Sequence, residues 1–199
     1  MKTWLGMAVA MLAAGVASAQ TAQQATPRAA DESQRPSAIR TGVFRGQPVT
    51  YAVINGKAVF EGDILLDHLD TLAPGARRAV PQGIGIAYPS YFWPKNGSGV
   101  AQIPYTVTSG SSNLDTALSQ FNATFTGIIQ FVARGSETDY VDFDLDTGNH
   151  NGTCESFVGH VGGAQQVGGS IDCNVGTLLH EMGHVVGLYH EQSRPDRDT

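Results

Sequence analysis

The stretch of this 199-residue chain with the most chemical meaning runs from His180 to His190, HEMGHVVGLYH. Residues four apart lie on one face of a helix, so His180 and His184 can aim two imidazole nitrogens at one point. A continuous helix would carry His190 roughly 15 Å past His180. The chain must therefore turn first, and Gly187 can adopt the left-handed conformation that ends helices.

Three histidines without a thiolate leave a fourth coordination position open, which is typical of catalytic zinc. Glu181 lies beside the first histidine, where it can accept a proton from water in that position. An H-E-x-x-H pattern alone can arise by chance on a surface helix. Here three of the six histidines fall within eleven residues, with a glycine at the bend, and this favours a metal site.

The residues from His180 to Asp198, HEMGHVVGLYHEQSRPDRD, resemble the signature of the astacin family of metzincin zinc endopeptidases. The resemblance covers nearly all of the chain from about Trp93 onward. Its other parts are Ile103-Pro104-Tyr105, Phe131 to Val141, and Cys154 to Cys173 with Gly162 to Gln166 inside it.

The resemblance implies one Zn²⁺ per chain, with His180, His184 and His190 as ligands and Glu181 as the general base. Glu191 matches the family glutamate that neighbours the buried amino terminus of the mature enzyme. The implied reaction is hydrolysis of internal peptide bonds in protein or peptide substrates.

The elements that must position these residues fit an α+β fold. Strands are predicted at 102–108, 128–132, 140–144 and 156–161, and the proline in the first suits an edge or a strand start. A helix is predicted after Ser112, with Phe121 and Phe125 in the core, and Asn174 or Thr177 can cap the active-site helix. The resemblance implies a zincin-like amino-terminal subdomain, a twisted sheet plus the active-site helix, over residues 79–199.

The two cysteines, Cys154 and Cys173, can pair in an oxidising compartment. In the family such a bridge holds the strand that borders the cleft, where the substrate lies as an added antiparallel strand. His150 and His160 have no partner at ligand spacing, so we expect them on the surface.

Residues 20–78 are predicted to be a linker and an inhibitory pro-segment. Asn55-Gly56 between two apolar runs indicates a hairpin. The second run leads into Phe60-Glu61-Gly62-Asp63, which resembles the F-x-G-D motif of astacin propeptides. There the aspartate is a zinc ligand that keeps the zymogen silent, so Asp63 is expected on the metal, and Gly62 should let the backbone come close to the cleft.

A helix is predicted over residues 64–70, with His68 solvated. Arg77-Arg78 is an exposed dibasic site for the activating cut, and the released Ala79 would approach Glu191.

Residues 1–19 read as a signal peptide, because a short apolar run is followed by Ala17-Ser18-Ala19. A stable membrane anchor is less favoured, since the run is short for a bilayer and lacks a basic stop-transfer flank. The protein is therefore expected to be secreted or periplasmic.

From Ala79 onward the chain has four basic and twelve acidic residues, a net charge of −8. This argues against nucleic acid as a partner, because phosphate binding needs a basic face.

The family's second subdomain is missing after Thr199. If the sequence is a fragment, it belongs to a secreted zinc endopeptidase. If Thr199 is the true end, an inactive zinc-binding remnant is the alternative, and a zinc hydrolase acting on other substrates is a weaker one. The sequence does not indicate an oligomeric state.

Overall fold

A computed structural model describes residues 36–45, 47–66, 72–74, 85, 89–146 and 154–191. The predicted signal peptide, most of the predicted linker, the Arg77-Arg78 junction and His150 lie outside these residues. So do residues 192–199 of the family signature. Within the described part, no helix has the length and apolar character needed to cross a membrane.

The predicted pro-segment forms an antiparallel meander. Strands β1 (Ala38–Phe44), β2 (Gln47–Ile54), β3 (Lys57–Phe60) and β4 (Ile64–Leu65) follow one another, and β5 (Ala73–Pro74) pairs with the free side of β1. The predicted hairpin is confirmed between β2 and β3. Asn55 and Gly56 have φ values of 48° and 77°, as a two-residue hairpin turn of the I′ type requires.

The helix predicted from residue 64 is wrong at its start. Ile64 and Leu65 form β4, and both are buried, with exposed fractions of 0% and 3%. An apolar run of this length has no clear period, and here the strands on either side, β3 and β9, decide its conformation. Residues 67–70 lie outside the described part.

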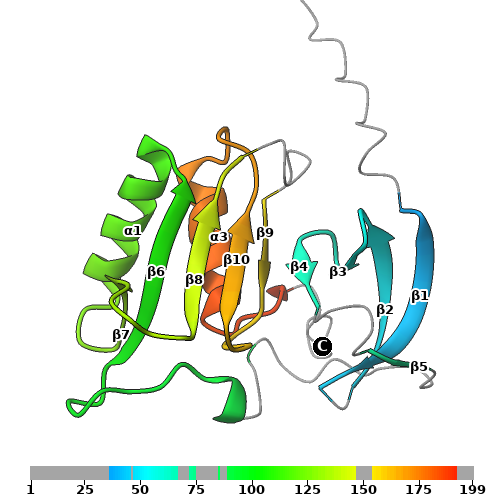
Figure 1. Ribbon diagram of the computed structural model, residues 1–199, viewed down its shortest axis with the longest axis horizontal. Helices are drawn as coiled ribbons and strands as arrows, with labels where there is room; N and C mark the ends of the chain where they lie inside the picture. Colours follow the sequence, from blue (N-terminus) through cyan, green and yellow to red (C-terminus); the bar gives the residue numbers. More distant parts are fainter. Residues whose placement is uncertain are drawn as a thin grey trace, which may run out of the picture. The chain divides into compact units, whose positions relative to one another are not determined.

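The predicted catalytic part contributes β6 (Ala101–Ser109), β7 (Ile129–Ala133), β8 (Tyr140–Asp144), β9 (Glu155–Phe157) and β10 (Ala164–Gly168). Their order is β9-β10-β8-β6-β7, with β9 antiparallel to β10 and the other pairs parallel. The parallel pairing of β4 with β9 joins this half to strands β1–β5 in one sheet. Figure 1 shows the two groups of strands on either side of this pair.

Most predicted strands of this half are confirmed, with two differences. The strand expected over 156–161 ends at Phe157, where the chain bends at Val158 and Gly159, and β10 was not predicted. Pro104 is in the middle of β6 rather than at its start. Pairing of β6 with β8 begins only at Tyr105, so the proline has a paired neighbour on one side only.

Two α-helices, α1 (Ser112–Thr124) and α3 (Val175–Val185), pack against each other and against this half of the sheet. Ser111 caps α1 by accepting a hydrogen bond from the Leu114 amide, one residue before the predicted start. Phe121 is buried as expected, whereas Phe125 at the helix end is 39% exposed. The predicted α+β class is confirmed, and the core under the sheet supports α3.

Candidate metal centre

Helix α3 presents its histidines because its apolar side is anchored in the core. Leu178, Met182 and Val185 are each 0% exposed. Asn174 caps the helix by accepting a hydrogen bond from the Thr177 amide at 3.0 Å, which selects Asn174 from the two predicted caps. The rotation of α3 is therefore set by packing on one side and capping at the start.

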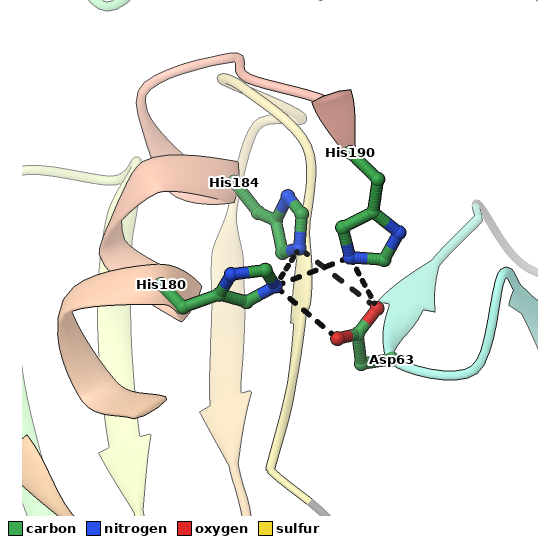
Figure 2. Close-up of side chains that lie close together, drawn as sticks. All are labelled: Asp63, His180, His184 and His190. Carbon is green, nitrogen blue, oxygen red and sulfur yellow. Dashed lines mark hydrogen bonds and ion pairs between the residues drawn. The ribbon is translucent and has the colours of Figure 1, made fainter. Parts of the chain in front are cut away.

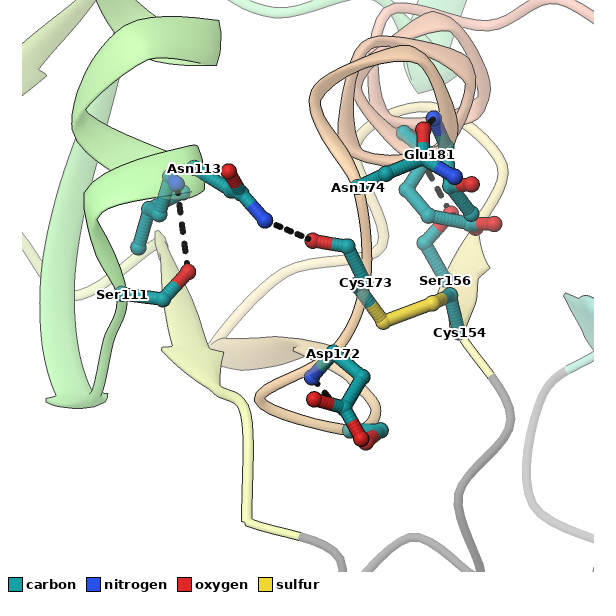
Figure 3. The surroundings of a disulfide bond; sticks show 11 residues. Ser111, Asn113, Cys154, Ser156, Asp172, Cys173, Asn174 and Glu181 are labelled. Carbon is teal, nitrogen blue, oxygen red and sulfur yellow. Dashed lines mark hydrogen bonds between the residues drawn. A yellow bond between two sulfur atoms is a disulfide. The ribbon is translucent and has the colours of Figure 1, made fainter. Parts of the chain in front are cut away.

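The predicted disulfide between Cys154 and Cys173 is present and ties the start of β9 to the turn before α3 (Figure 3). Asn113 of α1 donates a hydrogen bond to the Cys173 carbonyl at 3.1 Å. A bridge across a loop with a sequence separation of 19 stabilises the fold by about 3 kcal/mol in the loop-entropy model. Because of this bridge, β9 and α3 keep a common position.

The bend predicted at Gly187 is confirmed. Gly187 has a φ of 107°, its amide donates to the His184 carbonyl at 2.8 Å, and the Leu188 amide donates to the Gly183 carbonyl at 3.0 Å. Only glycine adopts this φ without strain. The turn ends α3 and brings His190 back toward the helix.

The three histidines converge on one point together with Asp63, which lies between β3 and β4 (Figure 2). The Nε2 atom of His180 lies 3.0 Å from that of His184 and 3.1 Å from that of His190. The Asp63 carboxylate lies 3.0 Å from His190 Nε2 and 3.3 Å from His180 Nε2. One ligand atom from each of the four residues lies within 4.8 Å of the others, so the structure brings together all four predicted ligand residues.

Two of these imidazoles are oriented for metal binding by hydrogen bonds at their Nδ1 atoms. His184 Nδ1 lies 2.7 Å from the Leu188 carbonyl, to which it donates. His190 Nδ1 lies 3.0 Å from a carboxylate oxygen of Glu61. A proton on each Nδ1 leaves the Nε2 lone pairs directed at the common point. Three imidazoles and one carboxylate form a donor set that suits zinc.

Glu181 is buried beside this cluster, at 1% exposure. One of its carboxylate oxygens accepts a hydrogen bond from the Ser156 hydroxyl at 2.7 Å. Burial raises the pKa of Glu181 to about 8, the nearby charges of Asp63 and Glu155 contribute to the rise, and the Ser156 hydrogen bond opposes it. A carboxyl group that exchanges its proton near neutral pH is suited to general acid-base chemistry.

Sequence reasoning missed two contacts of this site. Ser156 is completely buried under Glu181, and no local pattern marks it. Glu61 occupies the variable position of the F-x-G-D motif, with a φ of 53°. Gly62 has a φ of 106°, and a Cβ atom there would meet nothing within 4 Å. Gly62 is thus needed for its conformation, not for the close approach that was predicted.

The prediction that His160 is a plain surface residue is wrong. Its side chain is 19% exposed, its Nε2 lies 2.9 Å from the Asp139 carboxylate, and its ring packs on Trp93 at 4.7 Å. Glu191 is exposed, and its place beside a mature amino terminus remains a prediction.

Known proteins resemble large parts of this chain. The family model described as Astacin, a family of peptidases, matches residues 86–199. Zinc metalloproteinase nas-4 of Caenorhabditis elegans is 37% identical over 145 residues, which are 70% of this chain and 42% of that protein. High choriolytic enzyme 1 of Oryzias latipes is 34% identical over 146 residues, which are 69% of this chain and 49% of that protein.

A solved structure of high choriolytic enzyme 1, a hatching enzyme zinc-protease from Oryzias latipes, matches 58% of this chain and 58% of its own, with 31% identity and a TM-score of 0.48. The chain thus spans less than half the length of the two curated relatives described above.

Proposed function

Because its residues 86–199 match the family model, the chain belongs to the astacin family of zinc metalloproteases, and we propose that it is an exported zinc endopeptidase made as a zymogen. The observation that carries this proposal is the convergence of His180, His184 and His190 beside the buried Glu181. The residues 1–19 and the single disulfide support export.

Each residue of the cluster has one proposed role. His180, His184 and His190 hold the zinc ion. Bound zinc supplies the Lewis acidity that activates water and polarises a carbonyl group in hydrolases of this kind. Glu181 accepts the proton of the attacking water and passes it to the nitrogen of the leaving amine. Ser156 holds the Glu181 carboxyl in place through its hydrogen bond.

The substrate is proposed to be an extended polypeptide that pairs with β9. In this structure β4 takes that edge, with Ile64 opposite Ser156 and Leu65 opposite Phe157. Backbone pairing of this kind binds a peptide with little demand on its sequence. When the pro-segment leaves, the β9 edge becomes available to another strand.

Asp63 is proposed to keep the zymogen silent. Its carboxylate lies against the Nε2 atoms of the histidines, where water would otherwise approach the metal. The Ser156 amide donates to the Asp63 carbonyl at 3.1 Å, and Lys57 forms an ion pair with Glu155 of β9. Cleavage at Arg77-Arg78 is the proposed activation step.

Chelator-sensitive peptide hydrolysis tests the proposed function. The purified chain, cut by limited trypsin treatment, should hydrolyse casein or an internally quenched peptide, lose this activity with a zinc chelator, and recover it with added Zn²⁺. Bound zinc without hydrolysis of any protein or peptide would contradict the proposal.

Replacing Glu61 by glutamine should weaken zinc binding by the uncut chain about tenfold, because carboxylates that orient a ligating histidine contribute about 10–100-fold to metal affinity. The measurement is a competition titration against a chromophoric chelator. Lys57→Gln is the matched control, since it removes a charge from the same segment without touching a metal ligand. Equal zinc affinity of Glu61→Gln and the unaltered chain would show that the contact with His190 has no such role.

A further inference from the structure

Arg45 of the proposed pro-segment contacts Tyr91, Val158 and Tyr189 of the catalytic part, and we call these three residues the Arg45 pocket. It follows β1 and has a φ of 49°, a left-handed conformation that costs energy for a residue with a Cβ atom. Its Nη2 donates to the Val158 carbonyl at 2.6 Å, its guanidinium carbon lies 3.7 Å from the centre of the Tyr91 ring, and it hydrogen-bonds the Tyr189 hydroxyl. The pocket thus presents a carbonyl, an aromatic face and a hydroxyl to the guanidinium group.

The walls of this pocket are held by contacts that do not involve the pro-segment. The Gly159 amide donates to the His184 carbonyl of α3 at 2.8 Å, and Gln165 donates to the Gly159 carbonyl at 2.8 Å. The His160 amide donates to the Tyr91 carbonyl at 2.9 Å. The bend that carries the Val158 carbonyl and the chain that carries the Tyr91 ring are therefore fixed within the catalytic part, and we expect both to persist when Arg45 leaves.

The pocket lies next to the proposed cleft. Tyr189 directly precedes His190, and Val158 directly follows β9. Asp63, at the metal cluster, pairs through its carbonyl with Ser156. A strand antiparallel to β9 that passes the metal at this level places its preceding residues opposite Phe157 and Val158. The pocket therefore lies beside substrate residues that precede the bond to be cut.

We propose that Tyr91, Val158 and Tyr189 form a guanidinium-binding site, which Arg45 fills in the zymogen and which takes an arginine side chain of the substrate after activation. This assignment rests on the proposed protease function. A planar guanidinium can stack on the Tyr91 ring and donate in its own plane to the Val158 carbonyl and the Tyr189 hydroxyl. A lysine ammonium lacks this combination. The acidic balance of the catalytic part, net −8 from Ala79 onward, also favours a cation.

A titration that needs no enzymatic activity tests the site. In the full chain with Arg45→Gly, which suits the positive φ, methylguanidinium at low millimolar concentration should raise the unfolding temperature. Methylammonium should bind about tenfold more weakly, because it cannot stack and donate together. The unaltered chain should show no such rise, and Arg45→Gly combined with Tyr91→Leu should lose it. Arg45→Asn, also tolerated at positive φ, serves as a second test variant. If methylguanidinium does not selectively raise the unfolding temperature of either variant, the proposed site is wrong.

The substrate assignment is tested on the activated enzyme with pairs of peptides that differ only in arginine against citrulline. Citrulline keeps the shape of arginine and removes its charge. One position two to four residues before the cut should favour arginine about tenfold in kcat/KM, and Tyr91→Leu should abolish the preference. Selective methylguanidinium binding without such a preference would overturn the substrate role. Failure to cleave any peptide would contradict the proposed function and this role together, whereas the titration still decides the site.

Discussion

Glu181→Gln is expected to lower kcat/KM for peptide hydrolysis by about 10²–10⁴-fold, the usual contribution of a general base. The amide has nearly the same shape but cannot accept the proton of the attacking water. Zinc binding should stay unchanged, because the proposed ligands are His180, His184 and His190. The measurement is the steady-state rate on a quenched peptide, with zinc content determined on the same samples.

The stability of the variant against unfolding shows whether a lower kcat/KM comes from the missing base or from a damaged fold. The pKa of Glu181 is raised to about 8 by burial, so the site favours a neutral group at neutral pH, and glutamine supplies one. The variant should therefore be at least as stable as the unaltered chain near pH 7. Glu137→Gln, at an exposed carboxylate away from the cluster, is the matched control for charge removal. Unchanged kcat/KM in Glu181→Gln would contradict the role of Glu181.

Much of the metal centre could be predicted because its geometry is local. The spacing of His180 and His184 needs only one helix, and the return of His190 needs only a turn at Gly187. Asp63 was assigned through a short motif of the pro-segment. The cluster of these four residues agrees with that assignment, although their roles on zinc remain proposals. The hairpin at Asn55-Gly56 was equally predictable, since both positions need a positive φ.

Contacts between distant segments could not be predicted. Ser156 meets Glu181 across 25 residues, and Glu61 meets His190 across 129. Strand β4 was read as helix because its conformation depends on pairing with β3 and β9. Arg45 gives no signal in the sequence, yet it reaches Val158 across 113 residues. In each case the register of the assembled sheet decides which side chains meet.

Asp63→Ala is expected to raise peptide hydrolysis by the uncut chain about tenfold or more. Its carboxylate lies 3.0 Å from His190 Nε2 and 3.3 Å from His180 Nε2, and losing one metal ligand worth at least about 1.4 kcal/mol shifts the balance toward an open site by that factor. The measurement is the rate on a quenched peptide without trypsin treatment, with the chain shown by mass to be uncut. If the uncut variant is as inactive as the uncut unaltered chain, and both are active after cutting, the proposed role of Asp63 in latency is contradicted.

Two further variants distinguish the switch from general loosening of the pro-segment. Lys57→Ala removes the ion pair with Glu155 but leaves Asp63 in place, so the uncut chain should stay silent. Gly62→Ala leaves the carboxylate intact but strains the turn, because Gly62 has a φ of 106°. The added Cβ would clash with nothing, since no atom lies within 4 Å of it. If latency depends on the exact approach of Asp63, Gly62→Ala should activate the uncut chain partly. A similar activation by Lys57→Ala would instead assign latency to docking of the whole pro-segment, with β4 blocking the β9 edge.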